Sequence, residues 1–359
     1  MSSLEACAVI EGDAASAAIE RLLNDDEAES VVRTGGDHAV LHSPYGMVTL
    51  ALEAERLLIK ATASDETNLA YLKMGLAGRL VSAPGTGAVL RWTGNGSGDV
   101  VPVFFRELRV ISSVRVGPHI QRLRFASERL ERFATGGLHV RLLIPREGRK
   151  PVWPWVGEDG LLVWPRGEDA LTVRVYTIRA IDVEAGWVEV DFVLHPGFDT
   201  PAARFAEHAR PGDVIGMIGP GGGDVPETAN MLLLGDDTAV PAIARILKEL
   251  RPGTRADVVI EVDGPEDVQP LAVAEGSVRW LFRDGRAPGT TGLLSGHLGH
   301  IDAAALPDDI FVWAGCEFSD FREIRQILRK RWGLPRERQL VVPYWRRGSA
   351  GDEARHEAA

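Results

Sequence analysis

The stretch Arg174-Val175-Tyr176-Thr177-Ile178-Arg179 decides how the rest of the chain is interpreted. Residues 171–176 predict a β-strand, and Arg174 and Tyr176 share a face of it because strand side chains alternate. A guanidinium that pairs with a pyrophosphate, an aromatic ring and a hydroxyl are the groups that a flavin requires, and all three occur within four residues. The motif alone leaves open an ordinary strand with an exposed arginine and a half-buried tyrosine.

Length and composition indicate a globular protein of two or three domains, because the chain has 359 residues and 45% of them are hydrophobic. No run approaches the roughly 20 apolar residues of a membrane span, and no basic region followed by an apolar stretch opens the chain. We therefore expect a cytoplasmic protein without membrane insertion. Cys7 and Cys316 lie far apart, so neither a disulfide framework nor a zinc site is indicated.

The charge is unevenly distributed along the chain. The formal net charge of −11 argues against nucleic acid as a partner. Residues 1–100 hold fourteen acids and seven bases, whereas residues 320–347 hold nine bases and three acids. The basic segment either attracts a small anionic ligand or forms the solvated face of an amphipathic helix, and the sequence leaves both open.

Residues 1–84 predict a small α+β domain, which resembles a domain of unknown function that sometimes precedes a flavoreductase. Its expected elements are helices at 14–23 and 65–80, a hairpin at 38–50 and a strand at 55–63. His38 and His42 alternate on one strand, but two histidines without a third ligand are more often surface residues than a metal site. The glycine-rich residues 85–101 predict a linker and open no helix, which excludes a phosphate loop.

Two further domains follow the linker. From 102 to 226, short strands with few helical patterns predict an antiparallel β-barrel. From 227 to 348, alternating strands and helices predict a doubly wound α/β domain that binds a nucleotide. Residues 349–359 are expected to be a disordered tail.

A barrel of this kind followed by an α/β domain has the layout of the ferredoxin–NADP reductase superfamily. Within it, the chain resembles the siderophore-interacting proteins, which are ferric-siderophore reductases. The matching motifs occur in the family's order over about two thirds of the chain: Arg174–Arg179, Asp191–His195, Gly212–Asp213, Gly219–Gly222, Gly235–Pro241, Trp313–Glu317 and Tyr344–Arg346.

The resemblance implies FAD bound mainly by the barrel. Arg174 would neutralise the pyrophosphate, Tyr176 would pack against the isoalloxazine, and Thr177 would bond near N5. A helix beginning near Ala202 and Ala203 would point its amides at the pyrophosphate, although Ala203 replaces the family's usual hydroxyl residue. The remaining barrel positions expected to border the cofactor are Arg179, Asp191, Val193 and His195; alternatively, His195 merely ends a strand at the barrel rim.

The nucleotide is expected at the carboxyl ends of two strands of the α/β domain. Gly235-Asp236-Asp237-Thr238-Ala239 closes one strand and opens a helix, although Asp237 or Thr238 equally serves as an N-cap in a tight turn. Gly315 and Glu317 end a later strand on the same edge, where Gly315 lets the backbone approach a nicotinamide. His297 and His300 fall in a glycine-rich loop, and we expect no metal there.

The implied reaction passes electrons from NADPH or NADH, or from a ferredoxin, through FAD to the Fe(III) of a ferric siderophore, releasing the more loosely held Fe(II). Electron transfer requires no acid–base group, so we predict no catalytic residue. The chelate is expected beside Arg146 and Lys150 on one side and Trp345, Arg346 and Arg347 on the other. The alternatives are a general NAD(P)H:flavin or quinone oxidoreductase and a siderophore-binding flavoprotein without turnover.

Overall fold

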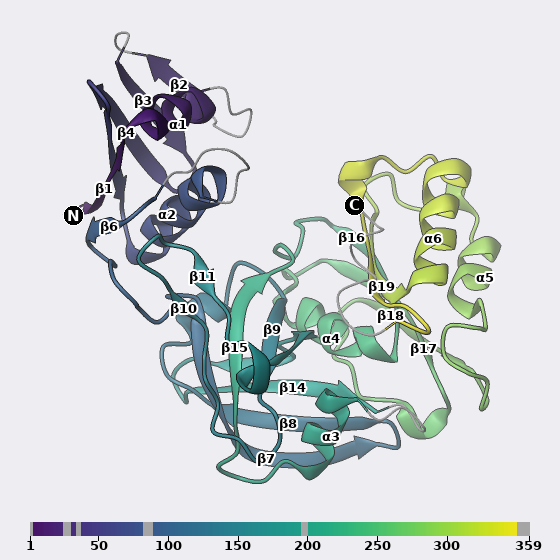
Figure 1. The fold of residues 1–359 in the computed structure, drawn as a ribbon. Coiled ribbons are helices and arrows are strands. Elements are labelled where there is room, and N and C mark those ends of the chain that lie inside the picture. The colour runs from purple at the N-terminus through teal and green to yellow at the C-terminus, as the bar shows by residue number, and fades with distance from the viewer. Residues whose placement is uncertain (1–2, 24–29, 34–36, 82–88, 195–199, 350–359) are drawn as a thin grey trace. The chain divides into compact units, whose positions relative to one another are not determined.

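The computed structural model describes residues 3–23, 30–33, 37–81, 89–194 and 200–349. The chain divides into two compact units (Figure 1). The first unit comprises Met1–Phe105 and Glu147–Ala170, and the second unit comprises Arg106–Arg146 and Leu171–Ala359. The expected tail at 349–359 lies, except for Ser349, outside the described residues. No helix in the described part of the chain is long and apolar enough to cross a membrane.

The first unit is built on a six-stranded antiparallel sheet in the order β2-β3-β4-β5-β1-β6. Two helices, α1 (Asp13–Leu23) and α2 (Glu66–Leu80), pack on one face of it, as Figure 1 shows. The strands are β1 (Leu4–Glu11), β2 (Ser30–Arg33), β3 (His38–Ser43), β4 (Gly46–Glu53), β5 (Arg56–Ala63) and β6 (Trp92–Gly94).

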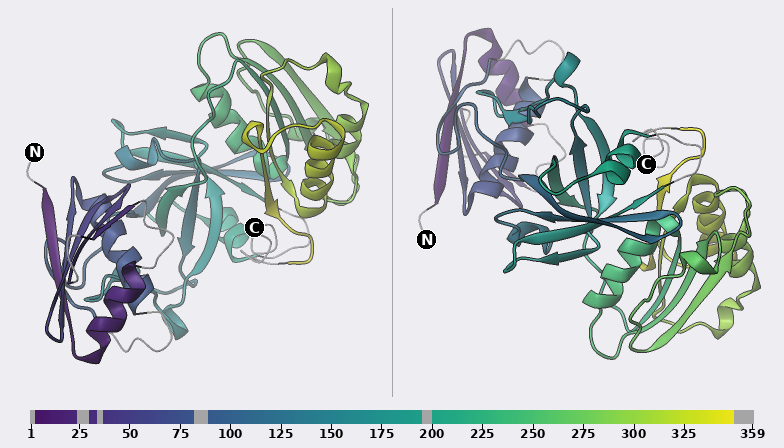
Figure 2. Two further views of the ribbon diagram at one scale, coloured as in Figure 1. Left: turned by 90° about the horizontal axis from the view of Figure 1, so that it is seen from above. Right: turned by 90° about the horizontal axis from the view of Figure 1, so that it is seen from below.

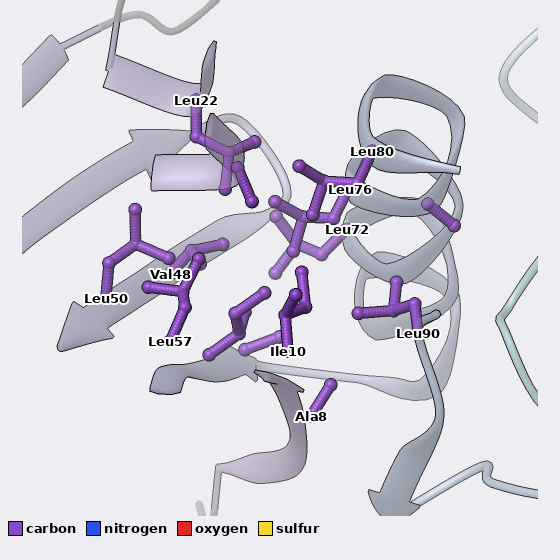
Figure 3. Packing of buried hydrophobic residues seen from close by; sticks show 14 of the residues in the cluster. Ala8, Ile10, Leu22, Val48, Leu50, Leu57, Leu72, Leu76, Leu80 and Leu90 are labelled. Carbon is purple, nitrogen blue, oxygen red and sulfur yellow. The ribbon is translucent and has the colours of Figure 1, made fainter. Parts of the chain in front are cut away.

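The core of the first unit forms because alternate residues of each strand point toward the helices. In β1, Ala6, Ala8 and Ile10 are buried while the residues between them are exposed. Figure 3 shows leucines of α2, among them Leu72 and Leu76, directed at the strand residues. Each such leucine contributes about 1.5–3 kcal/mol when it is fully buried.

Two segments differ from the expected domain division. Residues 92–94, expected in a linker, form β6, because Trp92 is buried in the core of the first unit. Residues 147–170, expected in the barrel, group with the first unit. Val156 exchanges backbone hydrogen bonds with Val100, and the Trp92 amide donates to the Glu158 carbonyl at 3.0 Å. These bonds hold β10 (Trp155–Val156) and β11 (Leu162–Val163) in the first unit.

The second unit begins with a seven-stranded antiparallel sheet in the order β12-β9-β15-β7-β8-β14-β13, here called the barrel. The edge strand β12 approaches β14, where the centres of the Tyr176 and Phe192 rings lie 4.5 Å apart. The helix α3 (Pro201–His208) packs on the barrel core through Ala202 and Ala206. The strands are β7 (Phe105–Gly117), β8 (Ile120–Ala126), β9 (His139–Ile144), β12 (Thr172–Thr177), β13 (Ala180–Asp182), β14 (Trp187–Val193) and β15 (Val214–Gly221).

The α/β domain has a five-stranded parallel sheet in the order β18-β17-β16-β19-β20. Its helices cover both faces (Figures 1 and 2): α4 (Val240–Glu249) packs on one face, and α5 (Leu293–His300) and α6 (Phe318–Gln326) pack on the other. The strands are β16 (Asn230–Asp236), β17 (Arg255–Val262), β18 (Gly276–Phe282), β19 (Phe311–Glu317) and β20 (Gln339–Trp345). The predicted fold class is confirmed, and the strand order reverses between β16 and β19, the switch point of this fold.

One local expectation in this domain is wrong. His297 and His300 lie on α5 rather than in a loop. Leu294 and Leu298 stand at helical spacing and are both fully buried, so their burial stabilises a helix that contains the two glycines Gly296 and Gly299.

Candidate functional site

The predicted cofactor strand β12 presents a guanidinium without a carboxylate partner. The Arg174 side chain is half-buried and donates to the Val173 carbonyl at 2.8 Å. No ion pair of Arg174 occurs among the residues that the structure describes, which leaves its charge available to an anion. The Tyr176 ring packs against Phe192, and burial raises the pKa of its phenol, which therefore stays neutral, although nearby Arg174 opposes the shift.

Thr177 begins a chain of hydrogen bonds that connects the barrel to the α/β domain. Its hydroxyl lies 3.2 Å from His139 Nδ1 on β9, and His139 Nε2 lies 3.0 Å from the Tyr344 hydroxyl on β20. Two glycines admit these rings. A Cβ at Gly222 would lie 2.5 Å from His139 Cδ2, and one at Gly315 would lie 2.9 Å from Tyr344 Cζ. Gly315, expected to admit a nicotinamide, thus makes room for Tyr344.

Asp191, expected to border the cofactor, forms ion pairs with two arginines. Its carboxylate is fully buried and accepts from Arg122 at 2.6 and 2.8 Å, and it lies 3.4 Å from the Arg179 guanidinium. Arg122 also donates to Gln269 of the α/β domain at 3.0 Å. The Asp191 carboxylate and the Arg179 guanidinium are therefore paired within the protein, and their contact with a cofactor stays a prediction. Val193 ends β14 and is partly exposed.

The start of α3 supplies the hydroxyl that residue 203 lacks. The Thr200 hydroxyl accepts from the Ala203 amide at 3.2 Å and caps the helix, with Pro201 in the first turn. Ala202 and Ala203 are buried. Threonine followed by proline is a sequence signal for this start, and it would have identified Thr200. His195 lies outside the described residues.

At the switch point, the buried Asp236 carboxylate gathers donors from three elements. It accepts from the Thr238 amide at 3.0 Å and from the Thr238 hydroxyl, from the Glu317 amide at 3.0 Å, and from Trp345 Nε1 at 2.8 Å. Burial raises the pKa of Asp236 to about 7, and the neighbouring Asp237 adds to the shift. Gly235 precedes it on β16, where a Cβ would lie 2.4 Å from the Ala239 side chain.

Two further carboxylates, those of Asp237 and Glu261, flank Arg283. No sequence pattern had indicated Arg283. Arg283 donates to Asp237 at 2.9 Å, and another of its nitrogens lies 3.7 Å from Glu261. All three side chains are buried. Burial raises the pKa of Glu261, which accepts from the Thr291 hydroxyl at 2.8 Å. The carboxyl ends of β16 and β17 are therefore rich in buried acids.

The C-terminal residues expected to bind substrate are attached to the switch point. Trp345 donates its indole N–H to Asp236, and the Arg347 amide donates to Glu317 Oε1 at 3.1 Å. The Arg346 guanidinium lies 4.8 Å from the centre of the Phe318 ring. The Glu317 carboxylate also accepts from Ser319 and is buried. Trp345 and Glu317 thus hold residues 345–347, here called the Trp345–Arg347 segment, at the switch point.

Arg146 and Lys150, expected to form the other wall, are both exposed. They belong to different units, Arg146 to the second and Lys150 to the first. Between them, Arg149 donates to Glu168 at 2.7 Å and to Asp169 at 3.0 Å within the first unit. Arg149 is therefore paired with acids of the first unit, whereas no ion pair of Arg146 or Lys150 occurs in the described part of the chain.

Comparison with known proteins agrees with this architecture. Residues 109–224 match the model of the siderophore-interacting FAD-binding domain, and residues 228–348 match that of the siderophore-interacting protein. The ferric vibriobactin reductase of Vibrio cholerae is 29% identical over 266 residues, which cover 73% of this chain and 96% of that protein.

Two solved structures extend the comparison. The siderophore-interacting protein of Aeromonas hydrophila superposes with a TM-score of 0.59 at 30% identity, covering 71% of this chain and 96% of that chain. A siderophore utilization protein from T. fusca gives a TM-score of 0.59 at 32% identity, covering 71% of this chain and 97% of that one. The chain belongs to the siderophore-interacting protein family.

Proposed function

We propose that the chain is an FAD-dependent reductase that passes electrons from a reduced pyridine nucleotide to the Fe(III) of a ferric siderophore. The observation that carries the proposal is the contact of His139 with both Thr177 and Tyr344, which joins the flavin-type strand to the last strand of the nucleotide-type domain. Relatives named ferric vibriobactin reductase and ferric acinetobactin reductase support it, the second at 32% identity over 183 residues.

The side chains of β12 fit FAD in charge and polarity. Arg174 brings a half-buried positive charge that no described carboxylate neutralises, as a pyrophosphate requires. Tyr176 offers a neutral aromatic ring, and His139 holds the Thr177 hydroxyl in place. Bound FAD would supply the chemistry that these residues lack, accepting a hydride and giving up single electrons.

The proposed nucleotide region is the carboxyl edge of β16 and β19, from Gly235 to Ala239, beside Gly315, whose own space the Tyr344 ring occupies. Asp236 organises this edge by holding Thr238, Glu317 and Trp345 together. We favour a pyridine nucleotide over a ferredoxin as the electron donor, because the strands of the sheet follow the order of nucleotide-binding folds.

Iron release follows from ligand chemistry. Fe(III) prefers the hard oxygen ligands of a siderophore, and reduction to Fe(II) weakens their hold. Arg346 and Arg347, in the Trp345–Arg347 segment, remain our proposed contacts to the chelate. Arg146 in the second unit and Lys150 in the first unit remain candidate contacts. None of these steps requires a proton-transferring side chain.

Anaerobic kinetics of the purified holoprotein test the proposal. NADPH and NADH are added separately and bleaching of the flavin absorbance is followed; ferric siderophores are then added, with an Fe(II)-specific chelator as reporter. We expect bleaching by a nucleotide and Fe(II) formation that restores the oxidised spectrum. Reoxidation by quinones but not by ferric siderophores would indicate a general oxidoreductase, and binding of siderophore without Fe(II) formation would indicate a binding protein.

A further inference from the structure

Three side chains that ligate metals in proteins meet where the barrel contacts the α/β domain. His119 lies in the turn between β7 and β8, and Asp263 and Asp267 lie in the segment that follows β17. One ligand atom of each, a histidine nitrogen or a carboxylate oxygen, lies within 4.8 Å of the other two. His119 and Asp267 are 148 positions apart, so no sequence motif indicates this group, here called the junction cluster.

The spacing of the ligand atoms fits one small cation. His119 Nδ1 lies 3.1 Å from each carboxylate oxygen of Asp267. A tetrahedral zinc ion with nitrogen and oxygen ligands at about 2.0–2.2 Å holds neighbouring ligands roughly 3.4 Å apart. An ion therefore needs little movement of the His119–Asp267 pair, and rotation of the partly exposed Asp263 side chain closes the remaining gap.

The carboxylates of the junction cluster have no basic side chain as a partner. Asp267 is 6% exposed, and in the described ranges neither it nor Asp263 forms an ion pair with a lysine or an arginine. By contrast, the buried Asp191 and Asp237 both pair with arginines. A buried carboxylate is costly unless it is paired with a positive charge or coordinates a metal. A divalent cation would supply the charge that Asp267 lacks.

The ligand atoms are oriented and one of them is open. Asp263 Oδ1 accepts from the Gly285 amide at 3.1 Å, which orients the carboxylate, while its Oδ2 accepts no hydrogen bond within the described residues. His119 Nδ1 faces the Asp267 carboxylate, and the hydrogen bond between them holds a single proton. An ion bound at Nδ1 takes the place of that proton, which is released to solvent.

Backbone hydrogen bonds hold both sides of the junction cluster. The His119 carbonyl accepts from the Leu194 amide at 2.7 Å, which fixes the turn against the end of β14. The Asp267 amide donates to the Gly264 carbonyl at 3.1 Å in a short 3₁₀-helix. Ligands on a fixed backbone need little ordering when an ion binds. An ion would therefore join two rigid segments, one from each domain.

We infer that His119, Asp263 and Asp267 bind one divalent transition-metal ion of the zinc type, which clamps the barrel to the α/β domain. One imidazole nitrogen with two carboxylates favours Zn²⁺ and its first-row neighbours, whereas Mg²⁺ prefers oxygen ligands alone. Water completes the coordination. The role is structural, so the inference does not depend on the proposed electron transfer.

Metal titration of the FAD-loaded, tag-free protein tests the inference. The protein is stripped with a chelator and titrated by calorimetry with Zn²⁺ and, separately, with Mg²⁺. The cluster variant is His119→Gln with Asp263→Asn, in which the glutamine keeps an N–H donor for Asp267. The control is His300→Gln with Asp308→Asn, which makes the same chemical changes at exposed positions of the α/β domain. Asp263→Asn alone is a milder second variant.

We expect the parent and the control to bind one Zn²⁺ per chain, and Mg²⁺ about 10-fold or more weakly than Zn²⁺. The cluster variant should bind Zn²⁺ about 10-fold or more weakly than the parent. Zn²⁺ should raise the melting temperature of the parent and of the control but not of the cluster variant, because only a folded site binds the ion. FAD content should be the same in all of them. Anomalous diffraction at the zinc edge should place the ion among the three side chains.

Four outcomes would overturn the inference. A folded parent that binds no Zn²⁺ would leave His119 and Asp267 as a simple hydrogen-bonded pair. Equal Zn²⁺ affinity in parent and cluster variant, or an anomalous peak at other histidines, would move the site elsewhere. Equal affinity for Mg²⁺ and Zn²⁺ would indicate an unselective acidic surface. If the double variant does not fold, the affinity of Asp263→Asn decides by the same comparison.

Discussion

The ionisation of Asp320 should make the second unit less stable as the pH rises. This residue lies in the first turn of α6 with 5% of its surface exposed. Burial raises the pKa of its carboxyl to about 7, and the acids Glu261, Glu323 and Glu317 add to the shift. Asparagine has the same shape and no charge, so Asp320→Asn removes the titration while preserving the packing.

The sign follows from proton binding. Between about pH 4 and pH 7 the folded protein holds a proton on Asp320 that the unfolded chain has released, so the free energy of unfolding falls as the pH rises. Above about pH 7 both states are ionised and the contribution is constant. For a carboxyl whose pKa moves from 3.8 to about 7, the parent should lose roughly 2–3 kcal/mol relative to Asp320→Asn between pH 5 and pH 8.

Urea unfolding of the FAD-saturated protein at several pH values measures this difference, with tryptophan fluorescence and circular dichroism as independent probes. Asp308→Asn is the control, because Asp308 is exposed in the same domain and its replacement removes the same charge. A pH dependence that is the same in Asp320→Asn as in the parent would refute the reasoning. So would an equal change in the control.

Three further changes test individual contacts. Arg174→Ala should weaken FAD binding by roughly 1.5–3 kcal/mol in titrations of the apoprotein, because a charge-assisted bond is lost; unchanged affinity would remove Arg174 from the site. Asp191→Asn should lower the free energy of unfolding by about 3–5 kcal/mol, since Arg122 and Arg179 lose their buried partner, and a cost under about 1 kcal/mol would contradict this pairing. His139→Phe should keep the fold but alter the spectrum and midpoint potential of the bound flavin, and identical values in parent and variant would place His139 away from the cofactor.

The fold of each domain, and the order of the domains along the chain, could be predicted because each domain has its own local pattern of apolar and turn residues. Short strands bounded by turns indicate an antiparallel barrel, and the buried run Met231–Leu234 before Gly235 indicates a parallel strand with helices on both sides. These patterns depend on neighbours in the chain. They appear in the structure as the seven strands of the barrel and as the five strands β16 to β20.

The contacts that complete the site depend on residues far apart in sequence. His139 and Tyr344 are 205 positions apart, and Arg122 and Asp191 are 69 positions apart. Each is an ordinary strand residue by local pattern, and only the pairing of strands brings them together. The sequence motif indicates Asp191. It does not indicate the ion pair of Asp191 with Arg122, because β8 and β14 meet only in the folded sheet.

The placement of residues 92–94 and 147–170 in the first unit could not be predicted, for a similar reason. A glycine-rich stretch predicts a linker, yet Trp92 within it fills the core of the first unit and donates its indole N–H to the Asp159 carbonyl at 3.0 Å. Residues 147–170 therefore return to the first unit after β9. Truncation near residue 98 would remove the partners of this returning segment, so the first unit cannot be treated as a simple N-terminal addition.

The electrostatics of the switch point bear on how a donor binds there. In this class of sheet, free amides at helix N-termini normally receive phosphate. Here the protein supplies its own anions, because the Asp236 carboxylate accepts from the Thr238 amide and the Glu317 carboxylate accepts from the Ser319 amide. Under the proposed function, a dinucleotide would therefore place its pyrophosphate away from these two helix starts. Protonation of Asp236, whose pKa lies near 7, lowers the repulsion that remains. For the proposed pyridine nucleotide, the nicotinamide ring, which carries no phosphate, would be the part that this edge accepts.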